Sequence, residues 1–346
     1  MGGERSEPTA PVMDYTFASG ELTLSGHLAQ PQGTTQRPPG LVLCHGFPTR
    51  GRESPQSGIS FPELADRVAA ELGFVVLTMN FRGCGKAEGD FSLQGWLDDV
   101  GAAVAHMHKM CGDGVWLAGY GSGASLAVVE GARNPRVRGV AAMATPRDFD
   151  DWAKHPRRLL LHARQVQVIK DPSYPADFDR WSGELKSVRP LRAAAELAPR
   201  PLLVIHGDSD DLTPMEDGLA IAEAHGNAEI RILSGAGHEL RHDPRAVAVL
   251  LGWLRRQRIA AESAAAAGPV TSVGSVEVTG SDLPAESVAV AEPAEPADSP
   301  GSAAPAGGAG SPGSPTSADS APGESQGPTN AGQDTSSATT DETKEP

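Results

Sequence analysis

The sequence predicts an α/β fold, in which helices wrap a mostly parallel sheet of about eight strands, followed by a long C-terminal tail that lacks a core. Short apolar runs, typical of strands, alternate with longer segments whose apolar residues recur every three or four positions, as on one helix face. This alternation favours a parallel sheet, because parallel neighbours need a crossover helix between them. The composition changes near residue 260, where we expect the folded part to end.

The first strands differ from the rest. Tyr15, Phe17, Leu22, Leu24 and Leu28 nearly alternate around a small Ser-Gly turn, which predicts an antiparallel hairpin at a sheet edge within residues 12–29. Buried strands are expected at 41–44, 74–79, 115–118, 137–144, 201–205 and 230–233. Helices are expected at 60–72, 93–110 and 123–132, after residue 213, and at 244–258.

Residues 147–199 interrupt the alternation. They contain several prolines and scattered aromatic residues, which favours irregular helices inserted above the sheet as a lid. Three segments are therefore predicted: a flexible N-terminus (1–11), an α/β domain (12–260) that carries the lid, and a disordered tail (261–346).

The tail carries most of the net charge of -15. Residues 261–346 hold thirteen acidic residues, one basic residue and no aromatic residue, among runs of Ala, Pro, Gly and Ser. Such a segment buries too little apolar surface to offset the entropy of ordering. We expect a solvated extension, with an acidic arm for a basic protein partner as the alternative.

Composition also excludes several classes of function. The charges of the first 260 residues are interspersed without a basic block, so we expect no nucleic-acid partner. No apolar run approaches the ~18 residues of a membrane span, and the N-terminus lacks a signal-peptide core, so we expect a cytoplasmic protein with no membrane partner. Cys44, Cys84 and Cys111 show no metal-binding spacing. No metal and no cofactor are expected.

Four motifs follow predicted strands: His45-Gly46-Phe47, Gly119-Tyr120-Gly121-Ser122-Gly123, the turn from Gly207 to Pro214, and Gly237-His238. In order and position they resemble those of the α/β-hydrolase superfamily, in its serine esterase and aminopeptidase-like branch, and the resemblance runs over residues 12–258. It implies an α/β-hydrolase fold, an oxyanion-hole N–H from Phe47, a catalytic acid at Asp210 rather than at the neighbouring aspartates, and a catalytic histidine at His238.

The central motif departs from this family. The family's nucleophile elbow is G-x-S-x-G, a strained turn between strand and helix that exposes a serine oxygen. Aligning both flanking glycines places Gly121 at the nucleophile position and Ser122 one residue later, where the family uses the backbone N–H for the oxyanion hole. Registering the motif on Ser122 instead would put the bulky Tyr120 at a position that needs close packing.

Without an oxygen at position 121, no acyl-enzyme forms. We therefore expect a pseudoenzyme-like hydrolase homologue with a degenerate catalytic triad, weakly active or inactive, that binds a small ester-, amide- or carboxylate-like ligand. One alternative is an active esterase-like serine hydrolase that uses Ser122, or water activated by Asp210 and His238. Another is a noncatalytic interaction protein, as in proteins that resemble neuroligins.

Other patterns receive simpler interpretations. Gly119-x-Gly121-x-x-Ala124 also fits a relaxed dinucleotide-binding fingerprint, but the next predicted strand ends without the carboxylate that this site requires. His45 and His206 are expected to form structural hydrogen bonds. The aromatic residues of the insertion, such as Trp152 and Trp181, either line a pocket or pack the lid onto the sheet.

Overall fold

The computed structural model describes residues 15–33, 38–48, 60–111 and 114–267. The predicted N-terminal segment 1–11 lies outside these ranges, as does most of the predicted tail.

A single sheet of eight strands runs through the described residues, in the order β1-β2-β4-β3-β5-β6-β7-β8. β1 and β2 form an antiparallel hairpin at one edge, β2 pairs antiparallel with β4, and all other neighbours are parallel. This confirms the predicted fold class. The strands are β1 Tyr15–Ser19, β2 Leu22–Ala29, β3 Gly40–Cys44, β4 Val75–Met79, β5 Val115–Tyr120, β6 Val137–Met143, β7 Leu202–Gly207 and β8 Glu229–Leu233.

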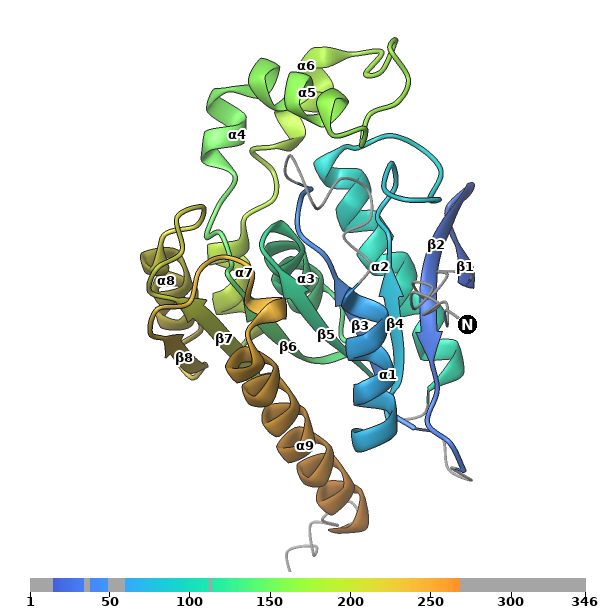
Figure 1. Cartoon of the computed structure of the whole chain (residues 1–346), viewed down its shortest axis with the longest axis vertical. Helices are drawn as coiled ribbons and strands as arrows, with labels where there is room; N and C mark the ends of the chain where they lie inside the picture. Colours follow the sequence, from blue (N-terminus) through green and yellow to red (C-terminus); the bar gives the residue numbers. More distant parts are fainter. Residues whose placement is uncertain (1–14, 34–37, 49–59, 112–113, 268–346) are drawn as a thin grey trace, which may run out of the picture. The chain divides into compact units, whose positions relative to one another are not determined.

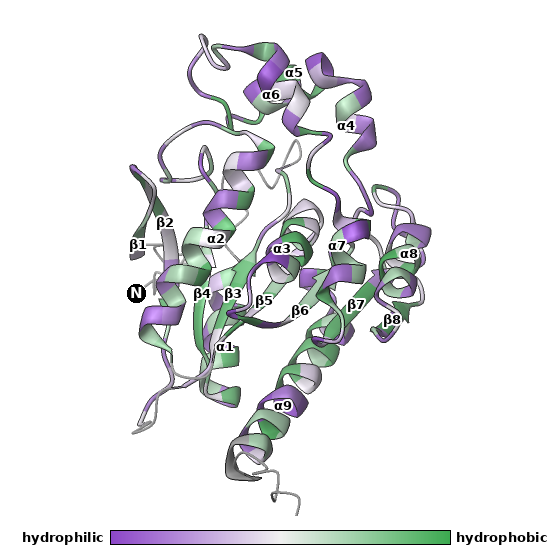
Figure 2. Cartoon of the chain, turned by 180° about the vertical axis from the view of Figure 1, so that it is seen from behind, coloured by the Kyte–Doolittle hydropathy of each residue, from purple (hydrophilic) through white to green (hydrophobic). Residues whose placement is uncertain are grey.

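Helices cover both faces of the sheet (Figure 1). On one face, α1 (Ser60–Leu72) lies beside α9 (Pro244–Ala267). The opposite face, seen in Figure 2, is covered by α2, α3, α7 and α8, each in contact with the next. Their bounds are α2 Leu93–Met110, α3 Ser122–Arg133, α7 Pro190–Leu197 and α8 Met215–His225.

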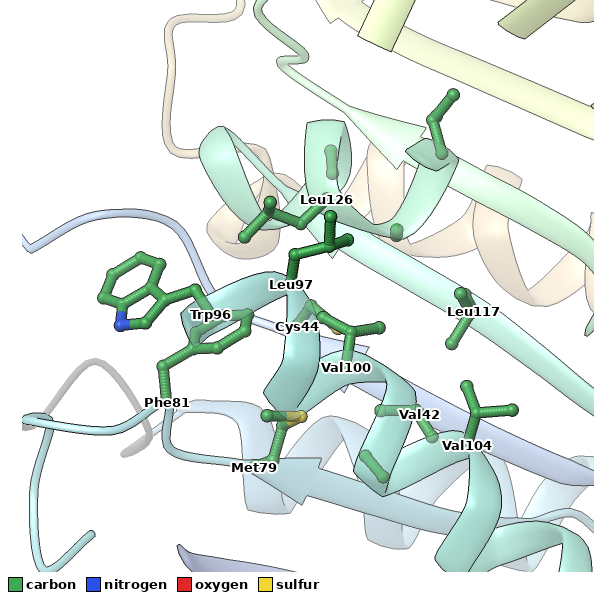
Figure 3. Close-up of a cluster of buried hydrophobic side chains, with 14 of the residues drawn as sticks. Val42, Cys44, Met79, Phe81, Trp96, Leu97, Val100, Val104, Leu117 and Leu126 are labelled. Carbon is green, nitrogen blue, oxygen red and sulfur yellow. The ribbon is translucent and has the colours of Figure 1, made fainter. Parts of the chain in front are cut away.

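The sheet separates two hydrophobic cores, and β3 contributes to both. Because side chains alternate across a strand, Val42 and Cys44 face α2 and α3, whereas Leu41 and Leu43 face α1 and α9. Figure 3 shows the first core, where apolar side chains of α2 meet the strands. Trp96 of α2 is fully buried.

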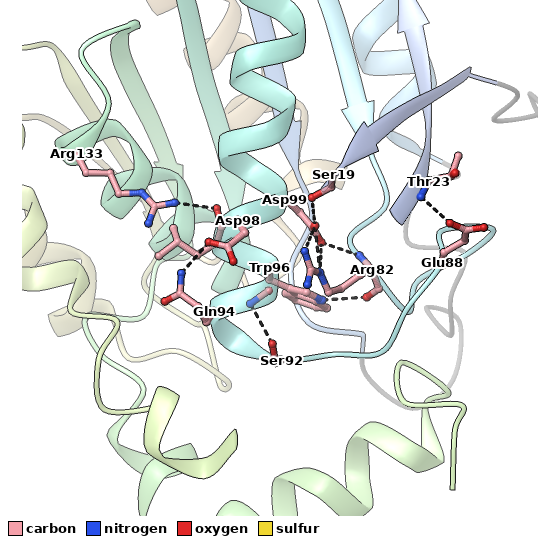
Figure 4. A network of polar contacts seen from close by, with 12 residues as sticks. Ser19, Thr23, Arg82, Glu88, Ser92, Gln94, Trp96, Asp98, Asp99 and Arg133 are labelled. Carbon is pink, nitrogen blue, oxygen red and sulfur yellow. Dashed lines mark hydrogen bonds and ion pairs between the residues drawn. The ribbon is translucent and has the colours of Figure 1, made fainter. Parts of the chain in front are cut away.

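A buried ion pair fixes the loop after β4 to α2 (Figure 4). The carboxylate of Asp99 is inaccessible to solvent and lies 2.7 Å from the Arg82 guanidinium. It also accepts hydrogen bonds from the Arg82 backbone N–H and the Ser19 hydroxyl. These bonds satisfy a buried charge that would otherwise be strongly destabilising.

The insertion is shorter than predicted. Three short helices lie beyond the ends of the parallel strands (Figure 1): α4 (Asp150–Lys154), α5 (Pro156–Gln165) and α6 (Phe178–Glu184). The last helix of the interval, α7, instead packs between α3 and α8 and buries Ala193, Ala194 and Leu197. The helix α7 belongs to the layer that covers the sheet, because its apolar side is buried against α3 and α8.

The final helix is longer than predicted, because it continues past Arg258 to Ala267. Alanine is the strongest helix former, and the added turns are rich in it. An ion pair between Arg258 and Glu262, four residues apart, joins the predicted end to the extension.

Candidate active site

The turn from β5 into α3 has the shape of a nucleophile elbow, and Gly121 lies at its centre. Its backbone angles are φ 54° and ψ -128°, a region that glycine reaches freely and other residues reach only under strain. A Cβ on Gly119 would lie 2.5 Å from the Cα of Ala124, and a Cβ on Gly123 would overlap the carbonyl oxygen of His45. Both flanking positions therefore require glycine, as the register centred on Gly121 predicts.

Ser122 is the first residue of α3, and its side chain is turned away from solvent. The residue is 5% exposed, and its Oγ has no hydrogen-bond partner among the described residues. Its backbone N–H is one of the first in the helix, which lack acceptors within the helix and attract negative charge.

His238 and Asp210 meet at the carboxyl ends of the strands. Asp210 follows β7 and His238 follows β8, and Nδ1 of His238 lies 3.0 and 3.1 Å from the two carboxylate oxygens. Because an ionised carboxylate only accepts hydrogen bonds, Nδ1 carries a proton. In the neutral ring, Nε2 is then a free acceptor.

A second histidine, His206, contacts the same carboxylate. Its Nε2 lies 3.4 Å from Asp210 Oδ2 and 3.0 Å from the Thr213 carbonyl oxygen. The backbone N–H groups of Leu212 and Thr213 also donate to Asp210. Burial alone would raise the pKa of Asp210, but the bonds from His206, His238 and Thr213 outweigh it and hold the pKa well below its usual range.

Nε2 of His238 faces Gly121. A Cβ on Gly121 would lie 3.4 Å from this nitrogen and 3.7 Å from the Cα of Gly46, both ordinary van der Waals distances. The turn therefore has room for a side chain at position 121, and that side chain would point at the histidine.

His45 positions the loop that carries Phe47. The backbone N–H of Phe81 donates to Nε2 of His45, so Nδ1 bears the proton and donates to the Gly46 carbonyl at 2.7 Å. Burial lowers the pKa of His45 to about 4; the bond to Gly46 opposes this shift, whereas the charge of Arg241 adds to it. The structural role predicted for His45 is confirmed.

A cavity of about 420 Å³ opens beside His238 and Gly121. Aromatic residues from the β3 loop and from the lid form much of its wall, with three aspartates between them. Among the described residues, the lining comprises Phe47, Gly121, Ser122, Pro146, Asp148, Phe149, Asp151, Trp152, Leu159, His162, Leu212, Thr213, Pro214, Asp217 and His238. The size is that of a site for a small molecule.

All five residues named from the sequence (Phe47, Gly121, Ser122, Asp210 and His238) meet at this end of the sheet, and all but Asp210 line the cavity. Trp152 lines the cavity and also packs against Phe47 and Phe149, whereas Trp181 is buried and donates to the Phe91 carbonyl.

Sequence reasoning missed the contact of His206 with Asp210 and the three aspartates of the wall. The position of His206 at the carboxyl end of a predicted strand could have indicated that it lies near the site. For the aspartates there was none, because they belong to the irregular lid and to α8.

Comparison with known proteins agrees with this architecture. A model of the alpha/beta hydrolase family matches residues 41–250, and the chain belongs to this family. No curated protein matched the chain.

Solved structures with the same fold include three of low sequence identity. Est1E from Butyrivibrio proteoclasticus is 16% identical, with 72% of this chain and 98% of that chain covered and a TM-score of 0.54. The alpha/beta hydrolase GrgF from Penicillium sp. sh18 is 20% identical, with 71% of this chain and 98% of that chain covered and a TM-score of 0.54. Proline iminopeptidase from Mycobacterium smegmatis is 15% identical, with 71% of this chain and 99% of that chain covered and a TM-score of 0.51. Identities this low establish the fold alone.

Two further features concern the described part of the chain. None of its helices has the length and apolar character needed to cross a membrane. Its His, Cys, Asp and Glu side chains form no group of three that could hold a metal ion.

Proposed function

We propose that this α/β hydrolase binds a small neutral ester- or amide-like ligand and does not form a covalent acyl-enzyme. One observation carries the proposal: Gly121 occupies the centre of the elbow, with its Cβ direction toward Nε2 of His238 at 3.4 Å. In a serine hydrolase the attacking oxygen is carried by this position. Glycine supplies none.

Other candidate nucleophiles are poorly placed for this role. The Oγ of Ser122 is buried without a described partner, and no hydrogen bond joins it to His238. Cys44 and Cys84 are buried, and desolvation strongly raises the pKa of both thiols, which suppresses the reactive thiolate. These features support Gly121 as the centre of a degenerate triad.

The charge of the cavity wall favours a neutral ligand. Asp148, Asp151 and Asp217 line the cavity, whereas no Lys or Arg appears in its described lining. Each of these aspartates pairs with an arginine outside the lining: Asp148 and Asp217 lie 3.6 and 3.2 Å from Arg147, and Asp151 lies 2.5 Å from Arg158. Because both arginines are engaged by the aspartates, a ligand carboxylate would lack a cation of its own in the described lining, so the site suits esters and amides better than free acids.

The pair formed by His238 and Asp210 supports a second candidate, slow hydrolysis by water. A neutral imidazole with a free Nε2 is a general base, and general-base catalysis does not need a serine. The N–H groups of Phe47 and Ser122 would receive the oxyanion. This activity would depend on His238 and not on Ser122.

Labelling with a fluorophosphonate probe tests the proposal, because the probe reacts only with an activated nucleophile. We expect no label on the wild-type protein and clear labelling of Gly121→Ser. The double variant Gly121→Ser/His238→Ala is expected to lose the label, since the new serine needs the base.

The site of any label decides between the candidates. Label on wild-type protein that disappears in Ser122→Ala would establish Ser122 as the nucleophile and overturn the proposal. Weak ester hydrolysis that survives Ser122→Ala but is lost in His238→Ala would support the water-based candidate.

A further inference from the structure

We infer that the ester- or amide-like ligand also carries an aryl hydroxyl, and that this O–H group donates to Nε2 of His238 from the space that a serine side chain would occupy. This inference rests on the proposed function, because it requires position 121 to be the centre of the site. It differs from that proposal by naming the group on the ligand that contacts the base.

The histidine presents an acceptor that has no protein donor in the described structure. Both carboxylate oxygens of Asp210 lie on the Nδ1 side of the ring, which fixes the proton there and leaves the lone pair on Nε2. Among the described residues, the hydrogen bonds of His238 are made through Nδ1, and none reaches Nε2. His238 remains partly exposed at 25%, on the cavity side. A ligand donor would satisfy this nitrogen.

The space in front of Nε2 admits a small group. A Cβ on Gly121 would meet nothing described closer than 3.4 Å. A ligand oxygen in this region can approach to the ~2.6–3.2 Å of a hydrogen bond to Nε2. Glycine therefore gives the ligand a place that a serine or alanine side chain would fill.

Aromatic rings line the cavity next to this place. The ring of Phe47 lies 5.2 Å from that of Trp152 and 5.7 Å from that of His162, and Phe149 lies 5.0 Å from Trp152. Such spacings are typical of favourable ring contacts, and a planar aryl group would extend them. Because the acidic wall disfavours a ligand that arrives as an anion, the hydroxyl enters protonated.

Binding then allows one proton transfer. The O–H bond of the ligand breaks, its proton forms a bond with Nε2, and the electron pair stays on the ligand oxygen. The resulting imidazolium is paired with the Asp210 carboxylate at 3.0 Å. The ligand anion faces the start of α3, where the unpaired N–H groups of the first turn stabilise negative charge.

Binding of 4-nitrophenol tests this arrangement, because its absorbance reports deprotonation of the hydroxyl. At a pH below the solution pKa of this phenol, we expect wild-type protein to produce a phenolate band. The methyl ether 4-nitroanisole, with the same ring and no O–H, is expected to bind about tenfold more weakly or not at all.

Two variants address the two contacts separately. Gly121→Ala fills the proposed oxygen position and His238→Ala removes the base, so each is expected to abolish the phenolate band. Gly226→Ala is the control for alanine at a positive φ, since Gly226 has φ 77° and open space around it. His108→Ala controls for loss of an exposed histidine. Both controls are expected to keep the band.

Equal binding of the phenol and its ether, absence of any binding, or a phenolate band that persists in both site variants would overturn the inference. If Gly121→Ala does not fold, as judged by circular dichroism, His238→Ala still decides the result. The proposed function fails separately, through fluorophosphonate label on the wild-type protein.

Discussion

Nε2 of His238 lies 3.4 Å from the position that a Cβ on Gly121 would take. A side chain at position 121 would therefore point at His238, but Gly121 has none. His238 is in turn held in place by Asp210. The turn retains its strained geometry, with φ 54° and ψ -128°. The strain of this turn can be measured through the effect of a substitution at Gly121 on the free energy of unfolding.

Gly121→Ser is expected to lower the free energy of unfolding by about 1–3 kcal/mol, because serine is strained at these backbone angles. The Cβ of the new side chain meets no clash. Urea unfolding measures the loss. Gly226→Ala, in the ordinary left-handed region at φ 77°, should cost less; an equal or larger cost there would contradict the assignment of special strain to the elbow.

Ser122→Ala is expected to leave stability within ~0.5 kcal/mol of wild type or to raise it, because the substitution removes a buried hydroxyl without a described partner. Ser125, one turn further along α3, donates to the Pro146 carbonyl at 2.6 Å. Ser125→Ala should therefore cost about 1 kcal/mol. Thermal unfolding compares the two variants, and a larger loss for Ser122→Ala would reveal a hydrogen bond at that hydroxyl.

His45 predicts a loss of stability in mild acid. Its pKa is about 4 in the folded protein, against an ordinary value of 6.5. Between these pH values the unfolded chain binds a proton at His45 that the folded chain does not. The contribution of His45 to the free energy of unfolding is therefore complete above pH 6.5 and declines toward pH 4. His106 and His242 also have lowered pKa values and add to this decline. Urea unfolding of His45→Gln across this window should show a shallower slope than wild type; an identical slope would argue against a buried neutral His45.

Arg82→Ala is expected to cost about 3–5 kcal/mol, because it leaves the fully buried Asp99 carboxylate without its cation. The exposed pair of Arg192 and Glu196 on α7 is the control, with side chains 81% and 53% exposed. Arg192→Ala should cost less than ~1 kcal/mol. Chemical denaturation distinguishes the two, and similar losses would mean that Asp99 finds other partners or is reached by water.

The sequence by itself determined the order of strands and helices, because local periodicity reports which side of each segment is apolar. The resemblance of its motifs to the α/β-hydrolase family implied Phe47, Gly121, Asp210 and His238 as site residues. These residues lie at one end of the sheet, because the carboxyl ends of parallel strands share an edge. The register of the elbow followed from its two flanking glycines, and the close contacts of Gly119 and Gly123 give the physical reason.

Tertiary structure alone decided which of the remaining residues meet. Whether α7 belonged to the lid or to the sheet-covering layer depended on the surface of α3 and α8, which its own sequence does not contain. The contact of His206 with Asp210 and the acidic wall of the cavity join segments that are distant in the chain or irregular. Hydrophobic periodicity shows which side of a segment is apolar, but not which element packs against that side. These contacts depend on which segments the fold brings together.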